Sequence, residues 1–106
     1  MFRALLVCLC LPLPAFAEIV RFDAEAHCKQ VAGFGGSYSN EMLNFCLNGE
    51  QRAYDALKSR WDAIAASIRT HCADVAAFGG PGSYEMLKFC VEQEEEAASS
   101  TPSFQY

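Results

Sequence analysis

The chain has 106 residues, with 8 lysines and arginines against 13 aspartates and glutamates, so its formal net charge is −5. This acidic balance gives it no electrostatic reason to bind nucleic acid or anionic lipid, because both attract basic surfaces. At this length we expect one small domain, below the size at which a hydrophobic core alone gives comfortable stability.

Residues 1–17 carry the three parts of a secretory signal peptide. Arg3 supplies a positive start, residues 4–11 form an apolar run, and Ala15-Phe16-Ala17 matches a cleavage site. The run is too short to span a bilayer, which needs about 20 apolar residues. We therefore predict a mature chain that starts at Glu18, lies in the periplasm or outside the cell, and inserts in no membrane. Loss of Arg3 leaves seven basic side chains against thirteen acidic ones, a formal charge of −6.

The mature sequence is a tandem duplication with an offset of 44 residues. Segment 27–36 matches 71–80, and segment 41–46 matches 85–90, without a gap. Twelve of these sixteen positions are identical, which is beyond chance in so short a chain. A fixed period of this kind indicates two copies of one supersecondary unit.

Each unit has the pattern of a helical hairpin. Glycine-rich segments at 33–37 and 79–83 predict the turns, because glycine readily ends a helix and reverses the chain. Apolar residues recur at spacings of three and four on either side of both turns. Glu41 and Glu85 fall in the first turn of each second helix, where negative charge suits the helix dipole.

We therefore expect an all-α fold of two tandem disulfide-closed helical hairpins, packed as a small four-helix bundle. One helical domain covers 18–97 and consists of two repeats, at about 18–60 and 61–97. The serine-rich residues 98–106 are predicted to form a disordered tail.

The connection between the repeats has two possible structures, because residues 51–70 contain no glycine or proline. A break near Ser59 to Asp62, with Asp62 as a helix cap, lets Trp61 and Ile64 fill a shared core. The alternative is one continuous helix of roughly 60 Å, which leaves both apolar side chains poorly covered. We favour the break.

The mature chain keeps an even number of cysteines, which in a small exported domain indicates disulfides. The four are Cys28, Cys46, Cys72 and Cys90. The first two each lie nine positions from Ser37, and the last two each lie nine positions from Pro81. Residues equidistant from the turn of an antiparallel hairpin face each other at the same height. The spacing therefore predicts one disulfide within each repeat, Cys28–Cys46 and Cys72–Cys90.

Two stretches carry a resemblance to a known pattern. They run from Phe34-Gly35-Gly36-Ser37-Tyr38 through Phe45-Cys46 to Glu50-Gln51-Arg52-Ala53-Tyr54 and Leu57, and from Gly82-Ser83-Tyr84 through Met86-Leu87 and Cys90 to Glu92-Gln93-Glu94. This pattern resembles small exported proteins of alphaproteobacteria. Those proteins have no assigned activity, so the resemblance implies export and architecture only.

A second resemblance follows from a methionine, a cysteine and a glutamate spaced by four residues. They are Met42, Cys46 and Glu50, repeated at Met86, Cys90 and Glu94. This spacing is similar to that of small helical envelope proteins related to a periplasmic lysozyme inhibitor. It implies a possible role in blocking an envelope hydrolase.

The candidate metal ligands outside the cysteines are His27, Met42, His71 and Met86. With thiolates they would suit Cu(I) or zinc. Oxidised sulfurs cannot serve as thiolate ligands, in which case the methionines are expected to fill core gaps and the histidines to be ordinary helix residues. The chain has no C-x-x-C motif, and adjacent helix residues such as His27 and Cys28 point in different directions, so we expect no catalytic residue and no cofactor.

These observations favour an exported, non-enzymatic helical module that binds an unknown envelope or extracellular protein or supports the envelope. Two alternatives remain open. One is a soft-metal (copper or zinc) or thiol redox module. The other is an inhibitor of an envelope hydrolase such as lysozyme, in which an acidic protein blocks a basic cleft.

Overall fold

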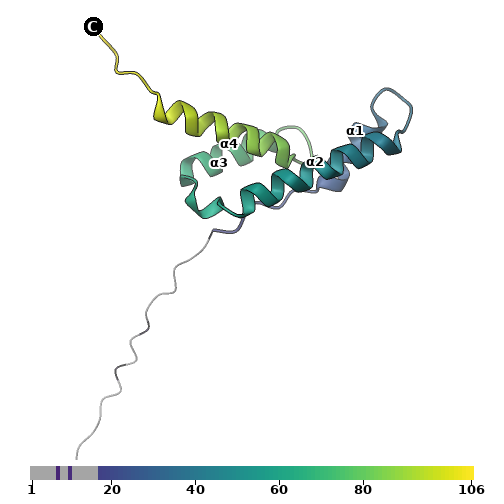
Figure 1. The fold of residues 1–106 in the computed structure, drawn as a ribbon, viewed down its shortest axis with the longest axis horizontal. Helices are drawn as coiled ribbons and strands as arrows, with labels where there is room; N and C mark the ends of the chain where they lie inside the picture. The colour runs from purple at the N-terminus through teal and green to yellow at the C-terminus, as the bar shows by residue number, and fades with distance from the viewer. Residues whose placement is uncertain (1–6, 8–9, 11–16) are drawn as a thin grey trace, which may run out of the picture.

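The computed structural model describes residues 7, 10 and 17–106, so most of the expected leader lies outside the described residues. Over that part the chain forms four α-helices, one 3₁₀ turn and no strand, which confirms the all-α class (Figure 1). The elements are α1 (Ala24–Gly33), α2 (Asn40–Lys58), η1 (Trp61–Ala63), α3 (Ala66–Ala76) and α4 (Tyr84–Ser99). Residues 100–106 have no regular structure and project away from the helices, while their disorder stays a prediction.

The second helix of each repeat begins in the same way. The side-chain oxygens of Ser39 and Ser83 accept hydrogen bonds from the backbone N–H three residues later, at 3.1 and 3.2 Å. Such caps satisfy one of the free N–H groups at a helix start. Glu41 and Glu85 lie in the first turns, as expected.

Both predicted disulfides are present. Cys28–Cys46 joins α1 to α2, and Cys72–Cys90 joins α3 to α4, each with a Cα–Cα distance of 5.5 Å. Each bond spans 18 residues of sequence. The loop-closure model gives about 3 kcal/mol of stabilisation for a loop of this size.

The connection between the repeats is broken, as favoured above. Helix α2 ends at Lys58, and Trp61 and Ile64 are 5% and 2% exposed in the core. The role assigned to Asp62 was wrong, because this residue lies inside η1 and caps nothing. Ile64 and Ala65 are extended, which turns the Ile64 side chain inward. Helix α3 starts after these two residues, and its first turn has no side-chain cap.

The two hairpins meet along α2 and α4. Glu50 lies beside the start of α4 at Tyr84, and Arg60 lies beside Glu95 near its end, so these two helices run parallel. Only the second half of α2 takes part in this contact, and α1 packs against α2 at the far end of the molecule (Figure 1). The four helices therefore form a pair of hairpins staggered along α2.

The hydrophobic core belongs mainly to the second repeat. It is built from residues of α2, η1, α3 and α4: Ala53, Leu57, Trp61, Ile64, Cys72, Ala76, Tyr84, Leu87 and Val91. Leu87 and Val91 are fully buried, whereas Leu43 and Leu47, their equivalents in the first repeat, are half-buried. One repeat thus completes its core with a helix from the other.

Residues 18–23, here called the strap, lie in extended form over this core. The Tyr84 hydroxyl holds the strap, since it accepts a hydrogen bond from the N–H of Phe22 at 2.7 Å and donates one to the carbonyl of Val20 at 3.0 Å. The ring of Phe22 also packs against that of Tyr84, with 5.0 Å between centroids. The strap therefore ties the start of the first repeat to the second.

The contact between the strap and the second turn predicts a sensitive glycine. Gly82 has a φ of +95°, and a Cβ atom there would lie 2.5 Å from the Phe22 ring. We expect Gly82→Ala to lower the free energy of unfolding by about 2 kcal/mol or more, from backbone strain and the displaced ring. Gly80→Ala is the matched control, because nothing lies within 4 Å of a Cβ there and its φ is not positive. Urea unfolding of both variants measures the difference, and equal losses would contradict the assigned role of Gly82.

Candidate functional site

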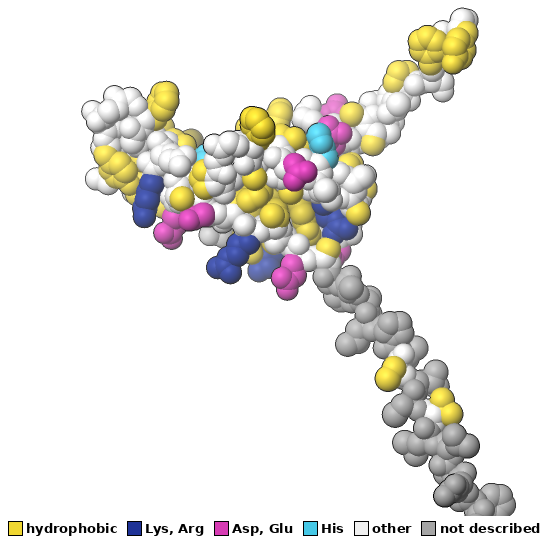
Figure 2. Space-filling model, turned by 180° about the vertical axis from the view of Figure 1, so that it is seen from behind, with side chains coloured by type: hydrophobic (Ala, Val, Ile, Leu, Met, Phe, Trp, Pro, Cys, Tyr) yellow, Lys and Arg dark blue, Asp and Glu magenta, His cyan; other side chains and the backbone are white. Residues whose placement is uncertain are grey.

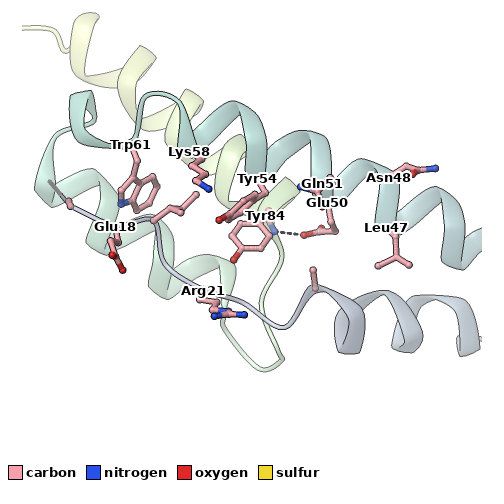
Figure 3. A pocket seen from close by; sticks show the side chains of 13 residues that line it. Glu18, Arg21, Leu47, Asn48, Glu50, Gln51, Tyr54, Lys58, Trp61 and Tyr84 are labelled. Carbon is pink, nitrogen blue, oxygen red and sulfur yellow. Dashed lines mark hydrogen bonds between the residues drawn. The ribbon is translucent and has the colours of Figure 1, made fainter.

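One carboxylate lies inside the contact between the hairpins. Glu50 is 1% exposed and is the single buried charged side chain among the described residues. Its Oε1 accepts a hydrogen bond from the Ser83 hydroxyl at 2.6 Å, and its Oε2 accepts one from the N–H of Tyr84 at 2.5 Å (Figure 3). The N–H of Glu85 adds a longer bond of 3.5 Å. Three donors from the second repeat therefore converge on one side chain of the first.

These bonds cap α4 with a residue from the other repeat. The first N–H groups of a helix have no partner within it, and the helix dipole favours negative charge at this end. A buried carboxylate is tolerated only when such donors satisfy it. Glu50 is not among the site residues predicted from the sequence. The available signal was the recurrence of glutamate at 50 and 94, four residues after the second cysteine of each repeat.

The two histidines considered as metal ligands each lie beside a carboxylate. The Nε2 atom of His27 is 3.7 Å from Glu50, and that of His71 is 3.6 Å from Glu94. Both positions of this pair are identical in the two repeats. Each histidine can form an ion pair whenever it is protonated, so the pair gives the histidines a contact that involves no metal.

The other candidate ligands do not gather around these histidines into a metal site. All four cysteine sulfurs are joined in the disulfides. Met42 and Met86 are 46% and 48% exposed, so the expectation that they fill core gaps was wrong. Each lies on a side of its helix that is left open to solvent. Within the described residues, no three histidine, cysteine or acidic side chains converge on a point that could hold a metal.

A groove of about 1000 Å³ lies between α2 and the strap (Figure 3). We call it the α2 groove. Its wall on α2 is a stripe of side chains at helical spacing, Leu47, Gln51, Tyr54 and Lys58, and Trp61 of η1 lies beyond the end of this stripe. Ile19 and Arg21 contribute from the strap, and the Lys58 ammonium lies 5.5 Å from the centre of the Tyr54 ring. The groove thus combines aromatic surface with two cationic side chains.

Exposed apolar side chains recur at the same positions of both repeats. Phe34 and Phe78, at the hairpin turns, are 90% and 92% exposed. Phe45 and Phe89 are also largely exposed, in addition to the two methionines. Figure 2 shows apolar side chains spread over the helical body and at the end of the molecule that holds the first turn. We call the set Phe34, Met42, Phe45, Phe78, Met86 and Phe89 the repeated apolar surface.

An exposed ion pair completes the contact between the hairpins. The Arg60 guanidinium donates two hydrogen bonds to the Glu95 carboxylate, at 2.7 and 3.3 Å. The hydrogen bond from Arg60, and then its positive charge, lower the pKa of Glu95 from the ordinary 4.5. The same bond raises the pKa of Arg60. This pair adds little to stability because both side chains are over a third exposed.

Loss of the Glu50 carboxylate should weaken the contact between the hairpins. We expect Glu50→Ala to lower the free energy of unfolding by about 3 kcal/mol, since it leaves the Ser83 hydroxyl and the N–H of Tyr84 without partners in a buried position. The repeat equivalent, Glu94→Ala, removes an exposed carboxylate and should cost at most about 0.5 kcal/mol. Denaturant unfolding compares the two, and similar losses would refute the capping role.

The ion pair predicts how Glu95 titrates. We expect its carboxyl to have a midpoint below 4.5 by NMR, and Arg60→Gln to return it to the ordinary range. Because the folded pKa is depressed, the small stabilisation from the pair is present above the unfolded pKa and disappears as the pH falls through the folded one. Arg52→Gln, elsewhere on α2, should leave the midpoint unchanged. An unaltered midpoint in Arg60→Gln would contradict this origin of the shift.

Comparison of the chain with protein-family models, with characterised proteins and with solved structures gives no match. The two resemblances noted in the sequence therefore stay predictions. None of the helices in the described part of the chain has the length and hydropathy needed to cross a membrane. The capped contact, the α2 groove and the repeated apolar surface are the features on which a functional assignment can be based.

Proposed function

We propose that this chain is an exported, non-enzymatic helical module that binds a protein partner of the envelope or the extracellular space. The repeated apolar surface carries the proposal. Its six large apolar side chains are exposed at the same three positions of each repeat. Aromatic and methionine side chains are also enriched in the contact surfaces of protein complexes.

The comparison between the repeats strengthens this interpretation. Exposed positions near the same helices have diverged, such as Gln30 against Asp74 and Asn44 against Lys88. The exposed phenylalanines and methionines have not diverged, although water penalises such exposure by about 25 cal/mol for each Å² of apolar surface. A shared contact with a partner accounts for identical residues at exposed positions where folding requires none.

The groups that chemistry would need are engaged in structural contacts. The soft-metal and thiol redox alternatives require free sulfurs in the repeats, whereas the four cysteines there lie in disulfides, and Cys28 and Cys72 are fully buried. The buried carboxylate of Glu50 caps a helix. These contacts support a binding role over a catalytic one.

Affinity capture from an envelope fraction tests the proposal. The oxidised mature chain, expected to begin at Glu18, serves as bait, and mass spectrometry identifies the captured protein. We expect the double variant Phe34→Ser with Phe78→Ser to lose this partner, because it removes the two most exposed rings of the helical body.

The double variant Gln30→Ala with Asp74→Ala is the control, since it changes exposed positions that differ between the repeats. It should retain the partner. Circular dichroism and intact disulfides check that both variants are folded. Retention of the same partner by the phenylalanine variant would count against the repeated apolar surface as the binding site.

A further inference from the structure

The two repeats are packed front to back. The stretch from Gly49 in α2 to Arg60, just beyond the end of this helix, contacts α4 from its capping residue Ser83 to Glu95. Because equivalent residues are 44 positions apart, the contact joins two unlike surfaces of the same unit. A contact of this heterologous kind uses one surface of each unit and leaves the other surface of each unit unoccupied.

The surface of α4 that packs against α2 has an equivalent at the start of α2 in the first repeat. This equivalent surface is unoccupied. We call it the acceptor face; it consists of Ser39, Asn40, Leu43, Leu47 and Gln51, the equivalents of Ser83, Tyr84, Leu87, Val91 and Glu95. Tyr84, Leu87 and Val91 are buried in the contact, whereas Asn40 is exposed and the two leucines are half-buried. In the second repeat the equivalent surface binds the carboxylate of Glu50, so we expect the acceptor face to bind a carboxylate as well.

The second repeat keeps the matching donor. Glu94 is the equivalent of Glu50, and it has the same neighbour, since His71 lies beside it as His27 lies beside Glu50. Its side chain is 46% exposed, against 1% for Glu50. Ala97 likewise repeats Ala53, which packs in the contact. A capping glutamate is thus presented on α4, and the described residues offer no helix start for it to cap.

We propose that a second copy of this chain docks onto the acceptor face, head to tail. The Glu94 carboxylate of one copy accepts hydrogen bonds from the Ser39 hydroxyl and the N–H of Asn40 of the next. The junction between copies repeats the junction between the hairpins within one chain. Since such a contact does not close on itself after one step, it extends to chains or rings of copies.

The tail of the docked copy reaches the α2 groove. From Asn40 to Tyr54, α2 rises about 21 Å at 1.5 Å per residue. Beyond Glu94, the end of α4 covers about 7.5 Å and five extended residues add about 17 Å, which brings Phe104 level with Tyr54. Phe104 and Tyr106 are 77% and 115% exposed on the projecting tail.

The α2 groove suits these two rings. Tyr54 and Trp61 offer aromatic surface, and Lys58 and Arg21 offer cations that pair well with aromatic faces. One second copy thus accounts for both the open helix start and the groove.

Sedimentation of the oxidised mature chain over a wide concentration range tests the proposal. We expect the average mass to rise with concentration past that of a dimer. Glu94→Gln should raise the dissociation constant about tenfold or more, because the charge-assisted bonds at the helix start are lost. Phe104→Ala with Tyr106→Ala should also weaken association. Glu96→Gln, which removes the same charge two residues away, is the matched control and should behave as the unaltered chain.

A mixing experiment tests the polarity of the contact. Asn40→Glu places a like charge opposite Glu94 and is compatible with a helix start, so the fold is kept while the acceptor face is blocked. This variant and Glu94→Gln should each associate weakly alone, but a mixture should form dimers of one copy each and nothing larger. In that mixture, one intact acceptor face meets one intact donor.

A chain that stays monomeric at its highest soluble concentration overturns the proposal. So does an association that Asn40→Glu and Glu94→Gln leave unchanged, or one that the Phe34→Ser with Phe78→Ser variant abolishes, since the repeated apolar surface would then mediate it. Retention of the captured partner by the Phe34→Ser with Phe78→Ser variant, while self-association follows the pattern above, would reject the proposed function alone. Circular dichroism confirms that each variant is folded.

Discussion

The arrangement of the two hairpins depends on the carboxylate of Glu50. A charge buried to 1% exposure is tolerable only where donors surround it, and these donors exist because α4 begins beside α2. The bond fixes where α4 starts along α2, and this register in turn sets Leu87 and Val91 against Ala53 and Leu57. The hydrogen bonds to the Glu50 carboxylate thus decide which apolar side chains of the two helices pack together.

The duplication has produced two units of different structural roles. The second repeat is covered on both sides, by α2 and the strap, and contains most of the core. Outside the half of α2 that contacts the second repeat, the first repeat buries little beyond its disulfide and Ala32. Matched segments with twelve of sixteen identical positions therefore reach different degrees of burial, because a front-to-back contact supplies only one of them with a neighbour.

The local structure was predictable from the sequence, and the contact between the repeats was not. The offset of 44 residues and the spacing about Ser37 and Pro81 were sufficient for the hairpins and both disulfides, since those depend on helical rise alone. The stagger, the strap and the role of Glu50 arise from pairings 33 to 64 residues apart, which periodicity does not encode. Asp62 failed as a cap because an extended pair of residues follows η1, which only the burial of Ile64 explains.

Both covalent cross-links lie within a repeat, and none joins one repeat to the other. The backbone between Ser59 and Ala65 is therefore the only covalent link between the hairpins among the described residues. Cleavage of one peptide bond there, in the exposed stretch around Asp62 and Ala63, yields two separate polypeptides, each closed by its own disulfide. Because the core draws on both, neither fragment can keep the whole of it. After such a cut, noncovalent contacts alone, among them the hydrogen bonds to Glu50, would hold the two repeats together.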